Sequence, residues 1–129
     1  MNKILVVDDD DDILDTIQLI LEIGGYEINP LNQADQVFET IKNFKPSLIL
    51  LDVVLGKIDG REICEQIKNN PGTAHIPVLM MSALYDMGDI REMNSPPDDF
   101  IPKPFKMDVL LEKIGTLIGQ KKTSRHDVN

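Results

Sequence analysis

The sequence predicts a doubly wound α/β fold, in which helices cover both faces of a five-stranded parallel β-sheet. Five short apolar runs recur along the 129 residues, and segments with helical spacing of apolar residues separate them. Three of these runs lack polar alternation, as is typical of strands that are covered on both faces. The strand–helix alternation implies right-handed crossovers between parallel strands.

The five apolar runs define the expected strands. They are residues Lys3–Val7, 26–28, 47–51, 76–81 and 100–101. The second run is short, and Gly24-Gly25 before it is typical of a helix C-terminus. The first, third and fourth runs are the three that lack polar alternation.

Helices are expected in the first three connections and after the last strand. Their periodic apolar positions are Ile13, Leu14, Ile17, Ile20 and Leu21; Val37, Phe38, Ile41 and Phe44; Ile63, Cys64 and Ile67; and Val109, Leu110, Ile114, Leu117 and Ile118. The fourth connection, residues 84–95, contains Gly88 and precedes Pro96-Pro97, so we expect a short, frayed or mobile helix there. Residues 1–119 are expected to form one domain, and residues 120–129 a polar C-terminal tail.

Composition excludes several classes of function. The net charge of −9 leaves no basic footprint for direct nucleic-acid binding. No apolar run approaches the roughly 20 residues that span a bilayer, and the first residues lack a signal-peptide pattern. Cys64 is the only cysteine, so no internal disulfide can form, and we expect a cytoplasmic protein.

Polar residues gather at the carboxyl ends of the expected strands, where doubly wound sheets bind ligands. They are Asp8, Asp9 and Asp10 after the first strand, Asp52 after the third, Ser82 after the fourth and Lys103-Pro104 after the fifth. Helix caps also favour strand ends, so each residue alone is weak evidence. Together, these residues predict one site at one edge of the sheet.

Carboxylates that lie close together repel each other, and a bound cation relieves this repulsion. Oxygen ligands favour Mg²⁺, or alternatively Mn²⁺. We interpret Asp8, Asp9 and Asp52 as such a cation site. Asp11 and Asp12 fit the acidic first turn of a helix, whereas Asp10 fits either role.

Asp52 follows the most apolar run of the chain, where a carboxylate is either a helix cap or a nucleophile. Carboxylates can accept phosphoryl groups to give acyl phosphates. Lys103 would supply a positive charge for a phosphate, and Ser82 could donate its hydroxyl, although Ser82 taken alone fits a structural hydroxyl better. The Lys103–Pro104 peptide bond could be cis, although most bonds before proline are trans.

Five segments, in this order, resemble the receiver domain of response regulators. They are residues 4–10, 48–52, 59–60, 77–83 and 103–105, and the match covers roughly residues 3–117. The resemblance implies a flavodoxin-like strand order, 2-1-3-4-5. It also implies a domain that catalyses its own phosphorylation and dephosphorylation, and not an enzyme of ordinary turnover.

The resemblance assigns a role to each site residue. Asp52 would accept a phosphoryl group from a sensor histidine kinase or a histidine phosphotransfer protein. Asp9, Asp52 and the backbone carbonyl of Val54 would ligate Mg²⁺ directly, and Asp8 would act through water. Lys103 would pair with the phosphoryl group.

Ser82 would bind the phosphoryl group, and Phe100 would be the aromatic residue that switches with Ser82. The partner that receives the signal is an unknown downstream protein, and the chain would be a monomer or a phosphorylation-dependent dimer.

The sequence departs from the family pattern at three places. Gly56 replaces a common proline, which would loosen the loop after Asp52. Pro96-Pro97 replaces a glycine–alanine pair near the usual output face. Val54 and Leu84, both apolar, occupy positions that tune hydrolysis, so we expect a long-lived phosphoaspartate.

Two alternatives remain open. A phosphatase of the haloacid-dehalogenase type would use similar residues, but its nucleophile would follow the first strand, at Asp8 or Asp10. A degenerate receiver would serve only as an interaction module.

Overall fold

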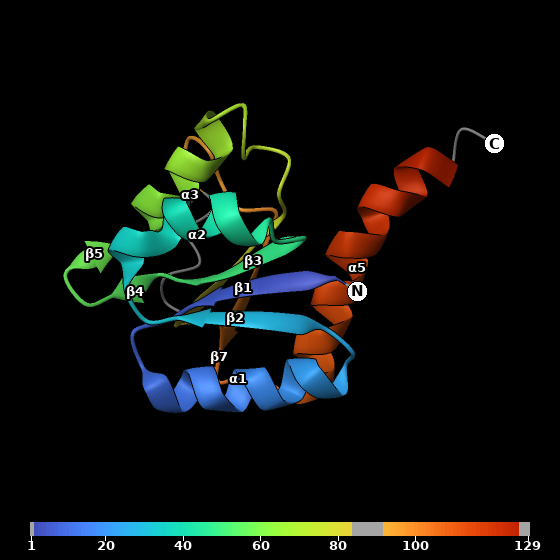
Figure 1. Ribbon diagram of the computed structural model, residues 1–129, viewed down its shortest axis with the longest axis horizontal. Helices are drawn as coiled ribbons and strands as arrows, with labels where there is room; N and C mark the ends of the chain where they lie inside the picture. The colour runs from blue at the N-terminus through green and yellow to red at the C-terminus, as the bar shows by residue number, and fades with distance from the viewer. Residues whose placement is uncertain (1, 84–91, 127–129) are drawn as a thin grey trace.

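The computed structural model describes residues 2–83 and 92–126, with Ala83 and residues 120–126 described by their backbone alone. Five parallel strands form the main sheet: β1 (Lys3–Val7), β2 (Glu27–Leu31), β3 (Leu48–Asp52), β6 (Val78–Ala83) and β7 (Asp99–Lys103). Their order in space is β2-β1-β3-β6-β7. Counted along the chain this is the predicted order 2-1-3-4-5, so the doubly wound fold is confirmed (Figure 1).

Helices cover both faces of the sheet, as predicted. They are α1 (Asp11–Ile23), α2 (Val37–Phe44), α3 (Gly60–Asn69) and α5 (Met107–His126), with a short 3₁₀ turn, η1 (Ala34–Gln36), before α2. In Figure 1, α2 and α3 lie on one face of the sheet and α1 on the other. The helix expected at residues 84–95 falls mainly on residues 84–91, which lie outside the described part of the chain.

The core has two halves because successive side chains of a strand point to opposite faces of the sheet. Ile4 and Val6 of β1 pack with buried residues of α1 and α5. Leu5 and Val7 of the same strand pack with buried residues of α2 and α3. The central strands are therefore apolar on both faces, which explains the absence of polar alternation in the sequence.

The predicted bounds of the strands were confirmed at β1 and needed correction elsewhere. β3 begins and ends one residue later than predicted, and β6 begins and ends two residues later. The ladder continues past the apolar runs, because Asp52 pairs with Met81 and Ser82 pairs with Pro102. Asp52 and Lys103 are therefore the last residues of their strands, and Ser82 is the last but one of β6, so the sheet fixes their backbones.

The two edge strands are longer than predicted, and each contains a proline. β2 runs through Pro30 to Leu31, and β7 spans Asp99–Lys103 through Pro102. Proline cannot donate a ladder hydrogen bond, so it is tolerated in edge strands, where one side of the backbone is unpaired. The prediction ended β2 too early because it stopped before Asn29 and Pro30.

A small hairpin, β4 (Val54–Leu55) and β5 (Ile58–Asp59), follows β3 and was not predicted. Each strand has only two residues, which is too short for a period-2 pattern to be visible. Gly56 begins the turn between them with φ +62°, a conformation that glycine adopts readily. The loop after Asp52 therefore contains a turn with strand pairing on either side of it.

The last helix continues beyond the boundary predicted at residue 119, since α5 runs to His126. Its C-terminal half extends away from the sheet (Figure 1). Among the described helices, none combines the length and the apolar character needed to cross a membrane.

Candidate functional site

Two carboxylates are buried at the carboxyl edge of the sheet. Asp8 follows β1 and is fully buried, and Asp52 ends β3 with 7% of its surface exposed. The Asp8 N–H donates to the carbonyl of Leu31 over 3.1 Å, and Asp8 Oδ1 accepts from the Asp10 N–H over 3.0 Å. These contacts hold Asp8 between the ends of β1 and β2.

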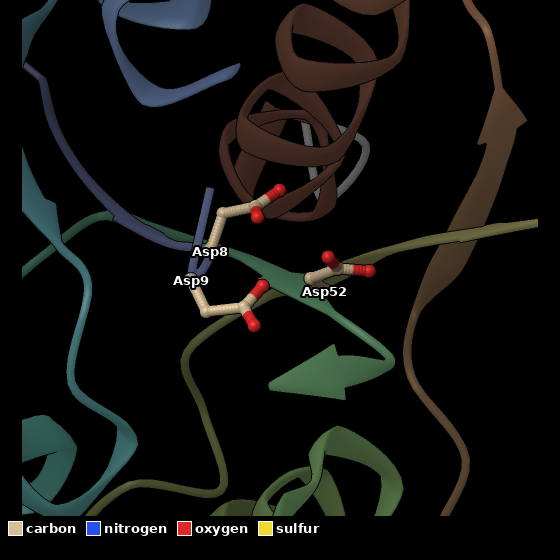
Figure 2. Close-up of side chains that lie close together, drawn as sticks. All are labelled: Asp8, Asp9 and Asp52. Atoms are coloured by element: carbon tan, nitrogen blue, oxygen red, sulfur yellow. The ribbon is translucent and has the colours of Figure 1, made fainter. Parts of the chain in front are cut away.

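Asp9 completes a group of three carboxylates. Each of Asp8, Asp9 and Asp52 offers an oxygen within 4.8 Å of the others, which is close enough to bind one metal ion. Figure 2 shows Asp8 and Asp9 next to each other, with Asp52 across from them at the end of β3. Asp9 is exposed, so a cation would enter the site from solvent on that side. The convergence predicted from the strand ends is therefore observed.

Lys103 lies between the two buried carboxylates. Its Nζ is 3.0 Å from Asp8 Oδ2 and 3.0 Å from Asp52 Oδ2. Burial lowers the pKa of Lys103, but the hydrogen bonds and charges of Asp52 and Asp8 outweigh burial and raise the pKa above its ordinary value. The lysine therefore keeps its positive charge at neutral pH. The Lys103–Pro104 peptide bond is cis.

The pKa of Asp52 is raised above its ordinary value, chiefly because burial disfavours the charged carboxylate. The hydrogen bond and charge of Lys103 act in the opposite direction, and the negative charge of Asp8 adds to the rise. Asp52 Oδ1 also accepts a long hydrogen bond, 3.4 Å, from the Val54 N–H. A second cation beside Asp52 would favour its ionised form.

Ser82 lies at the same end of the sheet, and its hydroxyl has an unusual environment. It is 1% exposed, and its Oγ has no hydrogen-bond partner within the described residues. A buried hydroxyl without a partner is unfavourable, so this Oγ is suited to a ligand oxygen. Phe100, in the adjacent β7, is half-buried and packs against the core on the α2–α3 side of the sheet.

The β4–β5 hairpin contributes a contact that the sequence did not reveal. The Gly56 N–H donates to Asp9 Oδ2 over 2.9 Å and so orients the exposed carboxylate. A proline at position 56 would have no N–H to donate. The departure from the family pattern noted at Gly56 therefore adds a hydrogen bond to Asp9. The side chain of Val54, on the same hairpin, is 58% exposed.

Gly60 is a second residue whose importance was missed. A Cβ at this position would overlap the carbonyl oxygen of Asp52, and the Gly60 N–H donates to the carbonyl of Val53 over 2.7 Å. Gly60 begins α3, whose N-cap is Asp59. The Asp59-Gly60 pair carried the resemblance in the sequence but did not reveal that the start of α3 lies against the Asp52 backbone.

The remaining acids of the first loop have a structural role. Asp10 is the N-cap of α1, because its side chain accepts from the N–H groups of Asp12 and Ile13. Asp11 and Asp12 lie in the acidic first turn of the helix, as predicted. Asp10, left open between two roles by the sequence, is therefore the helix cap.

Comparisons with known proteins identify relatives of this chain. A family model described as the response regulator receiver domain matches residues 4–115. The DNA-binding dual master transcriptional regulator RpaA of Synechocystis sp. is 34% identical over 92% of this chain and 49% of the relative. Response regulator MprA of Mycobacterium leprae is 28% identical over 93% of this chain and 52% of that relative. The chain thus spans about half the length of these curated relatives.

Solved structures share the fold. NtrX from Brucella abortus superposes with a TM-score of 0.87 at 31% identity, covering 100% of this chain and 30% of that chain. A CheY-like response regulator receiver domain protein from Methanospirillum hungatei gives a TM-score of 0.82 at 31% identity. The match covers 96% of this chain and 98% of that chain.

Proposed function

Because this chain belongs to the response regulator receiver domain family, with its role in two-component signalling, we propose that it accepts a phosphoryl group on Asp52. The donor is a sensor histidine kinase or a histidine phosphotransfer protein, and the reaction depends on Mg²⁺. Transfer changes the binding of a downstream protein.

The position of Lys103 is the observation that carries this proposal. The Lys103 ammonium lies 3.0 Å from Asp52 Oδ2, so it places a positive charge beside the carboxylate that would accept the phosphoryl group. A lysine that served only as a structural ion pair would explain the contact with Asp8 and Asp52, but not the buried Ser82 hydroxyl that lacks a partner in the described chain. A phosphoryl group on Asp52 would give both side chains an oxygen to bind.

The chemistry of the transfer follows from these positions. An Asp52 carboxylate oxygen forms a bond to phosphorus while the bond from phosphorus to the donor histidine nitrogen breaks. That nitrogen keeps the bonding electron pair and takes up a proton. Lys103 stabilises the negative charge on the transferring oxygens, and Ser82 donates its hydroxyl to one of them.

The carboxylates of Asp9 and Asp52, with the backbone carbonyl of Val54, would hold Mg²⁺, and Asp8 would act through water. Mn²⁺ is the alternative ion. When bound, the cation neutralises charge on the phosphoryl oxygens. The all-oxygen donor set is the kind that these hard cations prefer, and the crowding of three carboxylates within 4.8 Å favours a positive ion.

The phosphoryl group adds about −1.5 to −2 units of charge at neutral pH. Ser82 moves toward it, and Phe100 takes up the space that this movement frees. The result is a shift between two packings of the β6–β7 region, and its size depends on the contacts that the phosphoryl group makes in each.

Intact-mass measurement after incubation with acetyl phosphate and Mg²⁺ tests the proposal. We expect one phosphoryl adduct, absent in Asp52→Asn and absent when EDTA removes the cation. Asp15→Asn, which removes an exposed acid on α1, should label as the wild type does.

Two results would contradict the proposal. Rapid multiple turnover with an adduct at Asp8 or Asp10 would identify a phosphatase, and no adduct under any cation would identify a degenerate receiver.

A further inference from the structure

An open cavity lies at the amino ends of β3 and β6, whereas the acidic site lies at the carboxyl ends of the strands. It has a volume of about 550 Å³ and lies between the C-terminal ends of α2 and α3, which share one face of the sheet (Figure 1). Pro46, before β3, and Ile76, before β6, are among its lining residues. The cavity is therefore separated from Asp52 by the five residues of β3, which span roughly 16 Å at about 3.3 Å per residue.

The floor of this cavity is apolar. Ile41 and Ile76 are each 5% exposed and belong to the core, and Pro46 is buried. Phe38 remains 37% exposed at the rim, although it lies on a helix whose other apolar residues are largely covered. The cavity therefore offers apolar surface to a side chain from outside.

The walls of the cavity are cationic. Lys42 and Lys45 line it together with His75, and none of its lining residues is acidic. This is unusual in a chain that has 22 acidic and 13 basic residues, excluding histidine. Neither lysine ammonium has a hydrogen-bond or ion-pair partner within residues 2–83 and 92–119. By contrast, three other lysines are paired with aspartates: Lys68 with Asp98, Lys103 with Asp8 and Asp52, and Lys113 with Asp99.

Lysines near a helix C-terminus also offset the negative end of the helix dipole. The negative charge of the helix ends is, however, smaller than the positive charge of the two lysines. Two helix ends contribute about −0.5 each, or about −1 together, whereas Lys42 and Lys45 contribute +2. Among the residues that line the cavity, the two lysines therefore outweigh the helix ends by about one unit of charge.

From this combination we infer that the cationic groove, defined by Phe38, Ile41, Lys42, Lys45, Pro46 and Ile76, docks an acidic peptide segment of a partner protein. An apolar side chain of the segment lies on Ile41 and Phe38, and its flanking carboxylates pair with Lys42 and Lys45. Because the groove is at the far edge of the sheet, docking leaves Asp52 accessible. A partner can therefore remain bound while the phosphoryl group is added or removed.

The probe is a seven-residue peptide that alternates glutamate with leucine and phenylalanine, titrated into the ¹⁵N-labelled full chain. We expect saturable amide shifts at the residues of the cationic groove. Binding should weaken by about tenfold or more in the Lys42→Glu/Lys45→Glu variant. The Lys57→Glu/Lys106→Glu variant undergoes the same change in net charge on exposed lysines elsewhere, so it should bind as the wild type does.

The Lys42→Gln/Lys45→Gln variant separates docking from stability, because it removes both charges without adding negative charge at the C-terminus of α2. It should remain folded and still bind the peptide more weakly. Phosphorylation of Asp52 should leave the affinity unchanged.

Several outcomes would overturn the inference. They are absence of saturable shifts in the wild type, wild-type affinity in either variant of Lys42 and Lys45, and equal binding of a peptide with glutamine in place of glutamate. Free sodium glutamate that reproduced the shifts at the same carboxylate concentration would identify a simple anion site. A dimer, seen by sedimentation of the chain alone and lost in the lysine variants, would identify a second copy of this chain as the occupant.

Discussion

At the scale of single residues, burial determines how the acidic site responds to pH. The raised pKa of Asp52 means that the folded chain holds a proton on this carboxylate more tightly than the unfolded chain does. Stability therefore falls as the pH rises above 3.8, the ordinary value, and the loss is complete above the raised pKa. The charged carboxylate is thus retained at a cost to the folded state, which agrees with a role in chemistry.

Asp52→Asn should accordingly be more stable than the wild type at neutral pH without divalent cations, and the gain should vanish below pH 3.8. Urea unfolding in EDTA between pH 3.5 and 7.5 measures this. Asp15→Asn serves as the control for the loss of one negative charge, and it should show no such pH-dependent gain. A destabilised Asp52→Asn at pH 7 would show that the ion pair with Lys103 outweighs burial.

Cys64 differs from the site residues because burial makes it unreactive. It is fully buried, and burial raises its pKa to about 12. At pH 8 the thiolate, which is the reactive form, is then only about one part in ten thousand. We expect iodoacetamide to leave the native chain unmodified over an hour and to label it fully in urea, as followed by mass. Rapid labelling of the native chain would contradict this.

Val54 is exposed beside Asp52, and an apolar side chain there cannot orient an attacking water. We predict a long-lived phosphoaspartate, with Val54→Asn shortening the lifetime. Loss of the phosphoryl adduct with time, measured by mass, provides the test, and an unchanged lifetime in the variant would remove the argument. Leu84, the second apolar residue of the prediction, lies outside the described residues.

At the scale of elements, the quality of each prediction depended on how many contacts determine the element. β1 was located to the residue because both faces are covered and its residues Ile4–Val7 are all apolar and buried. The edge strands were cut short, since Pro30 and Pro102 hide the pairing that only a neighbouring strand reveals. The β4–β5 hairpin was missed because two-residue strands carry no period.

The site was predictable for a different reason. Parallel strands bring their carboxyl ends to one edge, so residues at four strand ends must meet there whatever lies between them. Contacts made by the backbone of the loops leave no comparable pattern in the sequence. The hydrogen bond from Gly56 to Asp9 and the contact of Gly60 with Asp52 depend on the loop conformation, which the sequence does not specify.

The start of α3 should be sensitive to any added atom. Gly60→Ala places a methyl group on the Asp52 carbonyl, with the Asp52 carbonyl carbon and Val53 Cα also within 3.1 Å. We expect a loss of about 2 kcal/mol or more in unfolding free energy, together with slower labelling of Asp52. Urea unfolding and the acetyl phosphate reaction measure the two effects.

Gly115→Ala provides the matched control, because a Cβ there meets nothing within 4 Å in α5. Alanine in a helix interior should stabilise the chain by roughly 0.5–1 kcal/mol. If Gly60→Ala were as stable as the wild type, the backbone of residues 52–60 would have to shift easily.

At the scale of the whole molecule, the net charge of −9 and the three clustered carboxylates oppose folding together. Mg²⁺ should therefore stabilise the chain beyond simple screening, by about 2.7 kcal/mol at a hundred times its Kd. Thermal unfolding in MgCl₂ and in NaCl of equal ionic strength separates the two effects. Asp9→Asn should lose the specific part, and equal stabilisation by both salts would exclude the cation site.

The prolines of β2 and β7 have a consequence for the protein in a crowded solution. An edge strand normally offers a row of unpaired amides on which a strand from another chain can assemble. Here Pro30 interrupts that row at one margin of the sheet and Pro102 at the other. Both margins are therefore poor templates for fibril growth, and the apolar sheet is protected against pairing edge to edge with the sheet of another chain.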